Sequence, residues 1–376
     1  MPIIICMLIA YKFRMYPNKS QIDIIEKHFG ACRFVYNFAL EKKILHYETE
    51  GKSLSRFELN NMLPELKQKN EWLKEVNSQS LQGATLHLDN AFTKFFREKK
   101  GFPNFKSRKN PVQSFSVPQH YSVDFDRNFV KLPKIGSVKT IFHRQFSGDL
   151  KTATISRNSS GKYFISILVD DGTEYPAPET FDASTTIGLD VGIKDFVVTS
   201  DGRKYDNPKF LKNSEARLKV LQKRLSRKKK GSSNFRKAKL QLAKQHEIVS
   251  NQRNDFQHKI SFQFISENQA VAVETLKIEN LLKNHKLSKS ISDAGWSGFF
   301  DKLKYKAKRY GKTILQIGQF EPSSKICSNC GYYNSDMTLS VRDWVCSDCG
   351  MHHDRDINAA INIKKFALDK QNLIGI

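Results

Sequence analysis

Residues 327 to 360 read CSNCGYYNSDMTLSVRDWVCSDCGMHHDRDINAA, and this stretch decides what kind of fold the chain can adopt. Two Cys-x-x-Cys pairs bracket its first part, with residues 331 to 345 between them. That spacing is typical of a tetrahedral four-thiolate zinc site on a ribbon of two knuckles. Acidic residues follow at once and open an Ala-rich helical run. The stretch therefore predicts a metal-stapled ribbon that leads the chain to carboxylates at a helix start.

The cysteines divide into a predicted metal site and two isolated thiols. The predicted zinc ligands are Cys327, Cys330, Cys346 and Cys349. Because four thiolates fill a tetrahedral shell, the zinc is expected to be structural. His352 and His353 could rival a cysteine as ligands, but with the shell full we interpret them as loop residues. Cys6 and Cys32 lie in apolar patterns and are interpreted as buried thiols.

The charge of the chain points to a polyanionic partner. Its 376 residues include 62 Lys and Arg against 38 Asp and Glu, a net charge of +24. Nucleic acid is the first candidate, with a membrane surface as the alternative. No apolar run approaches the roughly 18 residues that a membrane span needs. Residues 2 to 10 lack a basic n-region, so the start of the sequence is interpreted as a first strand, residues 3 to 16, rather than a signal peptide.

The N-terminal half mixes long helices with a β-rich segment. A helical stripe runs from Ser20 until Gly51 ends it, and a second helix is predicted for residues 78 to 100, with Gly101 as the C′ residue. Residues 112 to 170 have β texture, including a hairpin at 152 to 169. We infer a small barrel or curled sheet that has the N-terminal strand as its first member and the helices inserted after it.

From residue 186 the order of elements changes to three strands, a long basic helical pair broken near Gly231, a strand, a helix, a strand, the ribbon and a helix. A ribonuclease H-like nuclease fold has this order. Asp190 ends the first strand and Glu274 ends the fourth, which are neighbours in that fold. Asp356 lies on the first turn of the last helix. The three acids are therefore predicted to converge.

Converging carboxylates suit a nuclease that uses two Mg²⁺ ions about 4 Å apart, because Mg²⁺ prefers oxygen ligands. Asp354 competes with Asp356 for the third position. We favour Asp356, because it precedes x-Asn-Ala-Ala and would face the sheet, while Asp354 would cap the helix or support the metal ligands through a hydrogen bond. Taken singly, each acid has an ordinary reading as well, such as a turn residue or a helix cap.

Three basic segments are candidate nucleic-acid contacts, and each also has a purely structural reading. Lys106, Arg108 and Lys109 lie in an aperiodic segment that is either a linker or a phosphate contact. Arg227, Lys228 and Lys229 crowd the break between the long helices, where like charges repel unless a polyanion lies among them. Arg253 lies on a helix that either lines a nucleic-acid channel or is a capped surface helix.

Nearly the whole chain resembles the TnpB family, transposon-associated RNA-guided nucleases related to the type V CRISPR effectors. The N-terminal half matches in the blocks ACRFVYNFALEKK, SQSLQGATLHLDNAFTKFF and GFPNFKSRK. The C-terminal half matches in IGLDVGIKDFVVTSDG, NQRNDFQHKIS, VAVETLKIENLLKNHKLSKSISDAGW, PSSKICSNCG and HDRDINAAINI. Several long motifs in the family's order make the resemblance specific.

The resemblance implies an α/β multidomain protein in four parts. These are a wedge or oligonucleotide-binding-like β-barrel (1–17 and 111–182), a helical recognition lobe (18–110), a RuvC-like nuclease domain (183–320 and 351–376) and the zinc ribbon (321–350). It also implies catalytic roles for Asp190, Glu274 and Asp356, which match the family's acids.

The implied function is Mg²⁺-dependent cleavage of double-stranded DNA beside a short transposon-adjacent motif, directed by a guide RNA from the transposon end. Such a protein is expected in the cytoplasm of a prokaryote, on the nucleoid when bound to DNA. Two alternatives stay open. Some relatives have lost the acids and act as RNA-guided repressors, whereas this chain keeps all three. A transposase that joins DNA ends would use the same acid chemistry.

Overall fold

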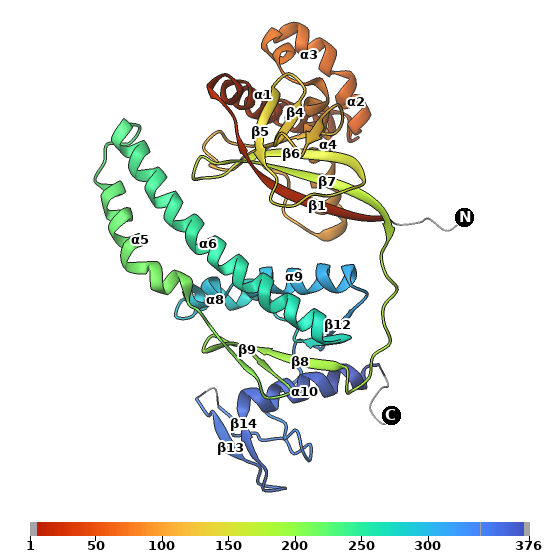
Figure 1. Ribbon diagram of the computed structural model, residues 1–376, viewed down its shortest axis with the longest axis vertical. Helices are drawn as coiled ribbons and strands as arrows, with labels where there is room; N and C mark the ends of the chain where they lie inside the picture. The colour runs from red at the N-terminus through yellow and green to blue at the C-terminus, as the bar shows by residue number, and fades with distance from the viewer. Residues whose placement is uncertain (1–5, 339, 372–376) are drawn as a thin grey trace. The chain divides into compact units, whose positions relative to one another are not determined.

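A computed structural model describes residues 6–338 and 340–371, and the chain divides into two compact units, Met1–Glu174 and Tyr175–Ile376 (Figure 1). Each unit has its own hydrophobic core. This division is coarser than the four-part organisation expected from the sequence, which stays a prediction. Residues 3 to 5 of the predicted first strand lie outside the described residues.

A seven-stranded antiparallel sheet forms the base of the first unit, in the order β2-β6-β7-β1-β5-β4-β3 (Figure 1). Its strands are β1 (Cys6–Tyr16), β2 (Gln113–Val117), β3 (Ser122–Asp124), β4 (Phe129–Leu132), β5 (Gly136–Ile141), β6 (Asp149–Arg157) and β7 (Tyr163–Glu174). The β6–β7 pair confirms the predicted hairpin. Among the described strands, the edges β2 and β3 are not paired with each other, which favours the curled sheet over the closed barrel.

The helices of the first unit are inserted between β1 and β2. They are α1 (Lys19–Glu50), α2 (Arg56–Asn61), α3 (Leu63–Lys69), the 3-10 helix η1 (Glu71–Glu75) and α4 (Ser78–Glu98). Gly51 ends α1 at φ 66°, as predicted. The predicted end of α4 at Gly101 is wrong: Lys99 adopts φ 51° and its amide donates to the carbonyl of Lys94, so the helix closes earlier. Cys32 is buried as expected, whereas Cys6 is only partly buried.

The second unit is built on a mixed five-stranded sheet in the order β10-β9-β8-β11-β12. Its strands are β8 (Thr186–Val191), β9 (Asp195–Thr199), β10 (Lys204–Asp206), β11 (Ala270–Val273) and β12 (Thr313–Gln316). β9 runs antiparallel to β8, whereas β11 runs parallel to it. Parallel neighbours end at the same sheet edge, so the first and fourth strands deliver their ends side by side, as the sequence predicted.

The helices of the second unit are α5 (Phe210–Ser226), α6 (Ser233–Glu267), α7 (Ile278–Leu281), α8 (Ser288–Ala294), α9 (Trp296–Arg309) and α10 (Arg355–Asp369). Among them, α6 and α9 pack on one face of the sheet and α10 packs on the other. Val271 and Val273 of β11 pack with residues of α6 and α9, while Ala270 and Ala272 pack with α10. A strand buried on both faces explains the continuous apolar run before Glu274. No helix in the described part of the chain is long and apolar enough to cross a membrane.

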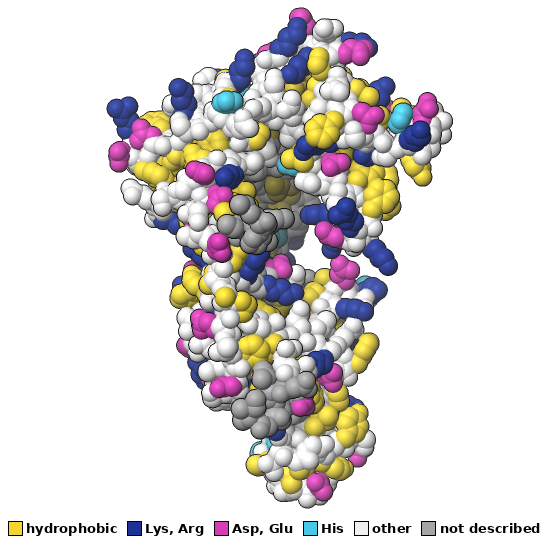
Figure 2. All heavy atoms as spheres, turned by 90° about the vertical axis from the view of Figure 1, so that its right-hand side faces the viewer, with side chains coloured by type: hydrophobic (Ala, Val, Ile, Leu, Met, Phe, Trp, Pro, Cys, Tyr) yellow, Lys and Arg dark blue, Asp and Glu magenta, His cyan; other side chains and the backbone are white. Residues whose placement is uncertain are grey.

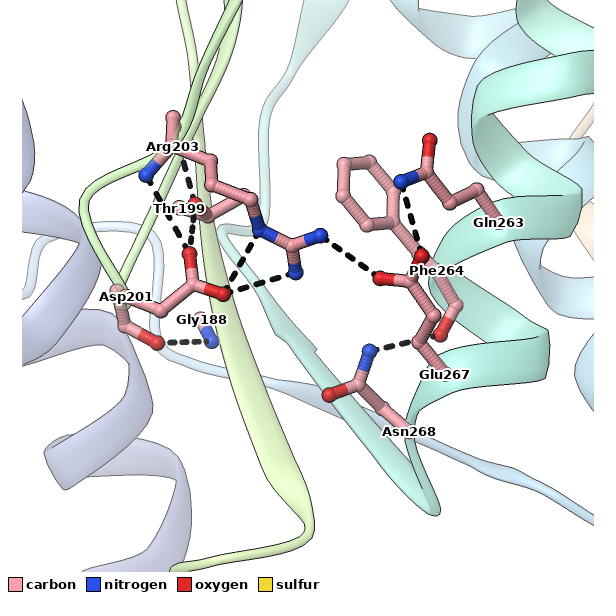
Figure 3. Close-up of polar contacts among 9 residues, drawn as sticks. Gly188, Thr199, Asp201, Arg203, Gln263, Phe264, Glu267 and Asn268 are labelled. Atoms are coloured by element: carbon pink, nitrogen blue, oxygen red, sulfur yellow. Dashed lines mark hydrogen bonds and ion pairs between the residues drawn. The ribbon is translucent and has the colours of Figure 1, made fainter.

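An ion-pair bridge joins the β9–β10 turn to the end of α6 (Figure 3). The Arg203 guanidinium donates to Asp201 at 2.8 Å and to Glu267 at 2.8 Å. Next to it, the hydroxyl of Ser200 accepts from the amide of Gly188 at 3.0 Å. The bridge therefore fixes the β9–β10 hairpin against α6. It lies near the start of β8, whereas Asp190 lies near the end of that strand.

α10 packs so closely on β8 that position 188 has no room for a side chain. A Cβ on Gly188 would lie 2.2 Å from the carbonyl oxygen of Ala360 and 2.9 Å from Cβ of Lys364. We expect Gly188→Ala to lower the free energy of unfolding of this unit by about 1 to 3 kcal/mol, because backbone must move. Urea unfolding on a Trp72→Phe background measures this, since Trp296 and Trp344 then report on this unit.

Gly298→Ala in α9 is the matched control for this prediction. The nearest atoms to its Cβ are the ends of two flexible side chains, Gln257 at 3.4 Å and Lys302 at 3.7 Å. Alanine also favours a helix by about 1 kcal/mol over glycine. The control should therefore be neutral or stabilising, and equal losses in both variants would show that close packing is not the cause.

Candidate active site

A cavity of about 720 Å³ opens in the second unit where β8 and β11 end. Asp190, Glu274 and Asp356 all line it. Asp190 is on β8, Glu274 directly follows β11 and Asp356 is on the first turn of α10. Three separate segments of the chain thus each supply one acid to the same cavity. Successive acids, from 190 to 274 and from 274 to 356, are more than eighty residues apart.

The environment of Asp190 disfavours its charged form. Loss of hydration comes first, and the carboxylates of Glu274 and Asp356 add to it, so the pKa of Asp190 is raised well above its ordinary value. The guanidinium groups of Arg355 and Arg342 act in the opposite direction. A carboxylate cluster of this kind gains from a bound cation, which removes the mutual repulsion.

Glu274 is held by a serine that the sequence analysis did not single out. The hydroxyl of Ser323 donates to Oε1 of Glu274 at 2.7 Å. Burial raises the pKa of Glu274, and this hydrogen bond partly opposes the shift. Thr275 is fixed as well, because its hydroxyl donates to the carbonyl of Ile317 at 2.7 Å.

Asp354 and Asp356 have separate tasks at the start of α10. Oδ1 of Asp354 accepts from the amides of Asp356 at 3.0 Å and Ile357 at 3.1 Å, so Asp354 is the N-cap, as predicted. Lys204 of β10 forms an ion pair with its other oxygen. Both oxygens of Asp354 are therefore engaged in structural contacts. Asp356 is the acid of this turn that lines the cavity.

Two arginines bind the carboxylate of Asp356, and neither was anticipated from the sequence. Arg342, which lies between the two cysteine pairs, donates at 3.1 Å, and Arg355 donates at 2.8 Å. Both arginines also line the cavity. The side chain of Arg342 is 48% exposed, whereas that of Arg355 is 12% exposed. Arg342 is therefore the partner with more freedom to leave Asp356.

The predicted convergence of the acids is found at the scale of the cavity but not at metal-ligand distances. In residues 6–338 and 340–371, the group of three or more potential ligands that could hold one metal ion is that of the four cysteines, whose sulfur atoms lie within 4.8 Å of one another, and it does not include the three acids. Asp356 instead bonds its two arginines. The three acids still have the oxygen chemistry that Mg²⁺ requires.

The four cysteines form a cluster suited to zinc. Cys327 and Cys349 have their sulfur atoms 3.7 Å apart, and Cys330 and Cys346 have theirs 3.6 Å apart. Four thiolates at 2.3 Å around a tetrahedral zinc ion would place sulfur atoms about 3.8 Å from one another. The donor set and the spacing therefore fit zinc, with four ligands and no open position.

The loop assignment of His352 and His353 is wrong, because both lie in β14 (His352–Asp354), which pairs with β13 (Asp343–Val345). His353 is buried and its Nε2 lies 3.0 Å from the sulfur of Cys327. The two histidines pair with Val345 and Trp344 of β13 and so complete a two-stranded sheet. His353 thus contacts a predicted ligand without displacing one.

The basic segment of the first unit is partly tied down. The Lys106 backbone exchanges two hydrogen bonds with the Asn37 side chain, at 2.7 and 3.0 Å, and its ammonium lies 4.0 Å from the Tyr36 ring centroid. Arg108 and Lys109 are exposed. These three residues lie in the loop between α4 and β2. They remain candidate phosphate contacts.

The basic residues of the second unit fall into two groups. Arg227, Lys228 and Lys229 are exposed in the turn between α5 and α6. Arg253 instead pairs with the buried Asp293 at 3.4 Å, which favours a structural role for it. Lys and Arg side chains are spread over the face drawn in Figure 2, with acidic side chains among them.

Three family models match separate parts of the chain. The model of OrfB_IS605, described as a probable transposase, matches residues 166–285, and a Cas12f1-like TNB domain matches 296–363. A helix-turn-helix domain model matches residues 7–52, although this segment forms the strand β1 and the single helix α1 here.

Full-length relatives and one solved structure agree with these matches. A Streptomyces pristinaespiralis protein named provisionally as an RNA-guided DNA endonuclease is 38% identical, over 94% of this chain and 88% of its own. InsQ of Escherichia coli K12, named in the same way, is 31% identical, over 94% and 91%. A chain of a Cas12f1–sgRNA–target DNA complex superposes with a TM-score of 0.56 at 16% identity, covering 96% of this chain and 99% of that one, which shows a shared fold.

Proposed function

The chain belongs to the TnpB family of RNA-guided DNA endonucleases, and from this premise we propose that it cuts double-stranded DNA beside a short transposon-adjacent motif, by two-metal hydrolysis at Asp190, Glu274 and Asp356. The guide in this proposal is an RNA from the transposon end. The second unit serves as a RuvC-like nuclease domain with an inserted zinc ribbon, and the first unit combines the wedge with the recognition lobe.

One observation carries the assignment of the site: acids from β8, from the end of β11 and from α10 line one cavity. A structural role for a single acid would not require the other two. The raised pKa values of Asp190 and Glu274 support a carboxylate site that a bound cation would stabilise. The parallel pairing of β8 and β11 gives the physical reason why two of the acids meet.

Asp190, Glu274 and Asp356 would hold Mg²⁺ with their carboxylate oxygens. When bound, such ions would activate the attacking water and stabilise the leaving oxygen. Asp356 must first release one or both arginines. Arg342, exposed and facing the cavity, is then placed to contact a phosphate oxygen of the substrate strand. Arg355, the first residue of α10, would then compensate the remaining negative charge.

A guide RNA explains the charge of the chain better than sequence-specific DNA readout does. Base pairing would identify the target, so the protein needs cations that contact the backbone rather than base-reading side chains. The exposed residues Arg108, Lys109, Arg227, Lys228 and Lys229 are proposed for this role. The net charge of +24 exceeds what these few residues supply, so further contacts are expected.

Purification from cells that carry the flanking transposon end tests the proposal. We expect one discrete RNA species to co-elute and the complex to cut matched double-stranded DNA only when Mg²⁺ is present. Cleavage should stop with EDTA and resume when Mg²⁺ is restored in excess. Sequencing of the RNA and gel analysis of the DNA products measure both parts.

Two other outcomes would replace this function with a specific alternative. RNA-dependent DNA binding without any break, under conditions where the acids are intact, would indicate a repressor. Joined DNA ends in place of simple breaks would indicate a transposase. The retained acids favour the nuclease over the repressor.

A further inference from the structure

We propose that Ser323 is a positioning residue for Glu274, and that the zinc-loaded ribbon keeps Ser323 in place. The inference rests on the proposed nuclease function. It assigns to the zinc ribbon a direct part in organising the acid cluster. Ser323 lies just before the first cysteine pair and is 6% exposed.

The hydrogen bond from Ser323 restricts the side-chain conformation of Glu274. A glutamate that follows a strand end has three rotatable side-chain bonds, and neighbouring negative charge pushes its carboxylate away from Asp190. The Ser323 hydroxyl holds Oε1 at 2.7 Å. The hydroxyl leaves the second oxygen, Oε2, to bind a cation. Ser323 thereby lowers the entropic cost of metal binding at this ligand.

Ser323 is itself fixed by α10 through buried amide side chains. Asn362 donates to the carbonyl of Ser323 at 2.8 Å and to that of Ile326 at 2.6 Å. Asn358 donates to the Ile326 carbonyl at 2.7 Å and accepts from the Ser328 amide at 2.8 Å. Both asparagines are nearly fully buried, at 1% and 2% exposure. Side chains of α10 therefore hydrogen-bond to the backbone at both ends of the segment 323–328.

The segment 323–328 contains the first predicted zinc ligand, so it links the cysteine cluster to the acid cluster. Cys327 lies between Ile326 and Ser328, whose backbones bond to Asn358. Bound zinc would hold Cys327 against the second cysteine pair, whose sulfur atoms lie within 4.8 Å of it. Loss of zinc would release this segment from one side and loosen the position of Ser323. Glu274 would then lose the partner that orients it.

Mn²⁺ binding, followed by electron paramagnetic resonance on the RNA-bound protein, tests the inference without relying on cleavage. We expect Ser323→Ala to weaken Mn²⁺ binding and to raise the Mg²⁺ concentration for half-maximal cleavage, each by about 10-fold. Ser323→Thr keeps a hydroxyl and should restore most of both. Excess Mg²⁺ should recover much of the maximal rate, since the carboxylates are intact.

Ser335→Ala is the matched control, since Ser335 is an exposed ribbon serine whose hydroxyl bonds only to the adjacent Asp336 among the described contacts. It should change neither Mn²⁺ affinity nor Mg²⁺ dependence. Unchanged metal dependence in Ser323→Ala, with only a lower fraction of active protein, would overturn the inference. So would a Thr variant as impaired as the Ala variant. Wild-type protein that binds RNA but never cuts would overturn the proposed function instead.

Discussion

Asp190→Asn is expected to abolish cleavage of matched DNA while RNA binding and zinc content stay unchanged. Asp190 interacts electrostatically with both other acids, and in the proposed mechanism its carboxylate is the metal ligand that an asparagine amide replaces poorly. Loss of a residue at the centre of a catalytic constellation lowers the rate by roughly 10³-fold or more. Asp356→Asn should have an effect of the same order. Single-turnover cleavage with a labelled DNA duplex measures the loss.

Asp354→Asn is the control that the chain itself offers. Asparagine caps a helix as well as aspartate does, so α10 should keep its start. The lost ion pair with Lys204 is partly exposed and contributes less than about 1 kcal/mol. Cleavage should therefore stay within a few-fold of wild type. If Asp354→Asn were inactive and Asp356→Asn active, the two assignments would be exchanged, and activity in Asp190→Asn would sink the site as a whole.

Removing one zinc ligand is the second change with a large expected effect. Cys346→Ser should lower bound zinc from one equivalent to a small fraction, because a tetrathiolate site has no spare ligand. Metal binding and folding are coupled in small ribbons, so solubility should fall at the same time. Cleavage should fall as well, since the ribbon supplies Arg342 and Ser323 to the acids. Atomic emission and a solubility assay measure the first two effects.

Cys6→Ser controls for the loss of a thiol as such. Cys6 is partly buried in β1 and belongs to the other unit, so zinc content should not change. Full zinc occupancy in Cys346→Ser would show that the ligands are misassigned. Normal cleavage by a variant whose ribbon is replaced by a short linker would show that the acids do not depend on it.

Much of the nuclease unit could be predicted because its signals are local. The helical stripes, the β-hairpin pattern and the cysteine spacing each depend on neighbouring residues. Element order then predicted that the first and fourth strands of this unit are neighbours, and the parallel β8–β11 pairing confirms this. Asp354 as the cap of α10 is likewise confirmed, since capping is a property of one turn.

The contacts that complete the site could not be predicted, because they join residues far apart in the chain. Ser323 reaches Glu274 across 49 positions, and Arg342 reaches Asp356 only because the ribbon folds back on α10. No spacing rule identifies such pairs. The prediction for the end of α4 was wrong for another reason. Lys99 adopts a left-handed conformation, which sequence rules assign to glycine.

The central place of β1 in the seven-stranded sheet has a consequence for biosynthesis. β1 is made before its partners β5 and β7, which follow only after the whole helical insertion, at residues 136–141 and 163–174. Until then both edges of this strand are unpaired on the ribosome, and unpaired edges invite association between nascent chains. Premature termination between α4 and β7 should therefore yield aggregates rather than a shorter soluble protein, and chaperone demand should peak over this interval of translation.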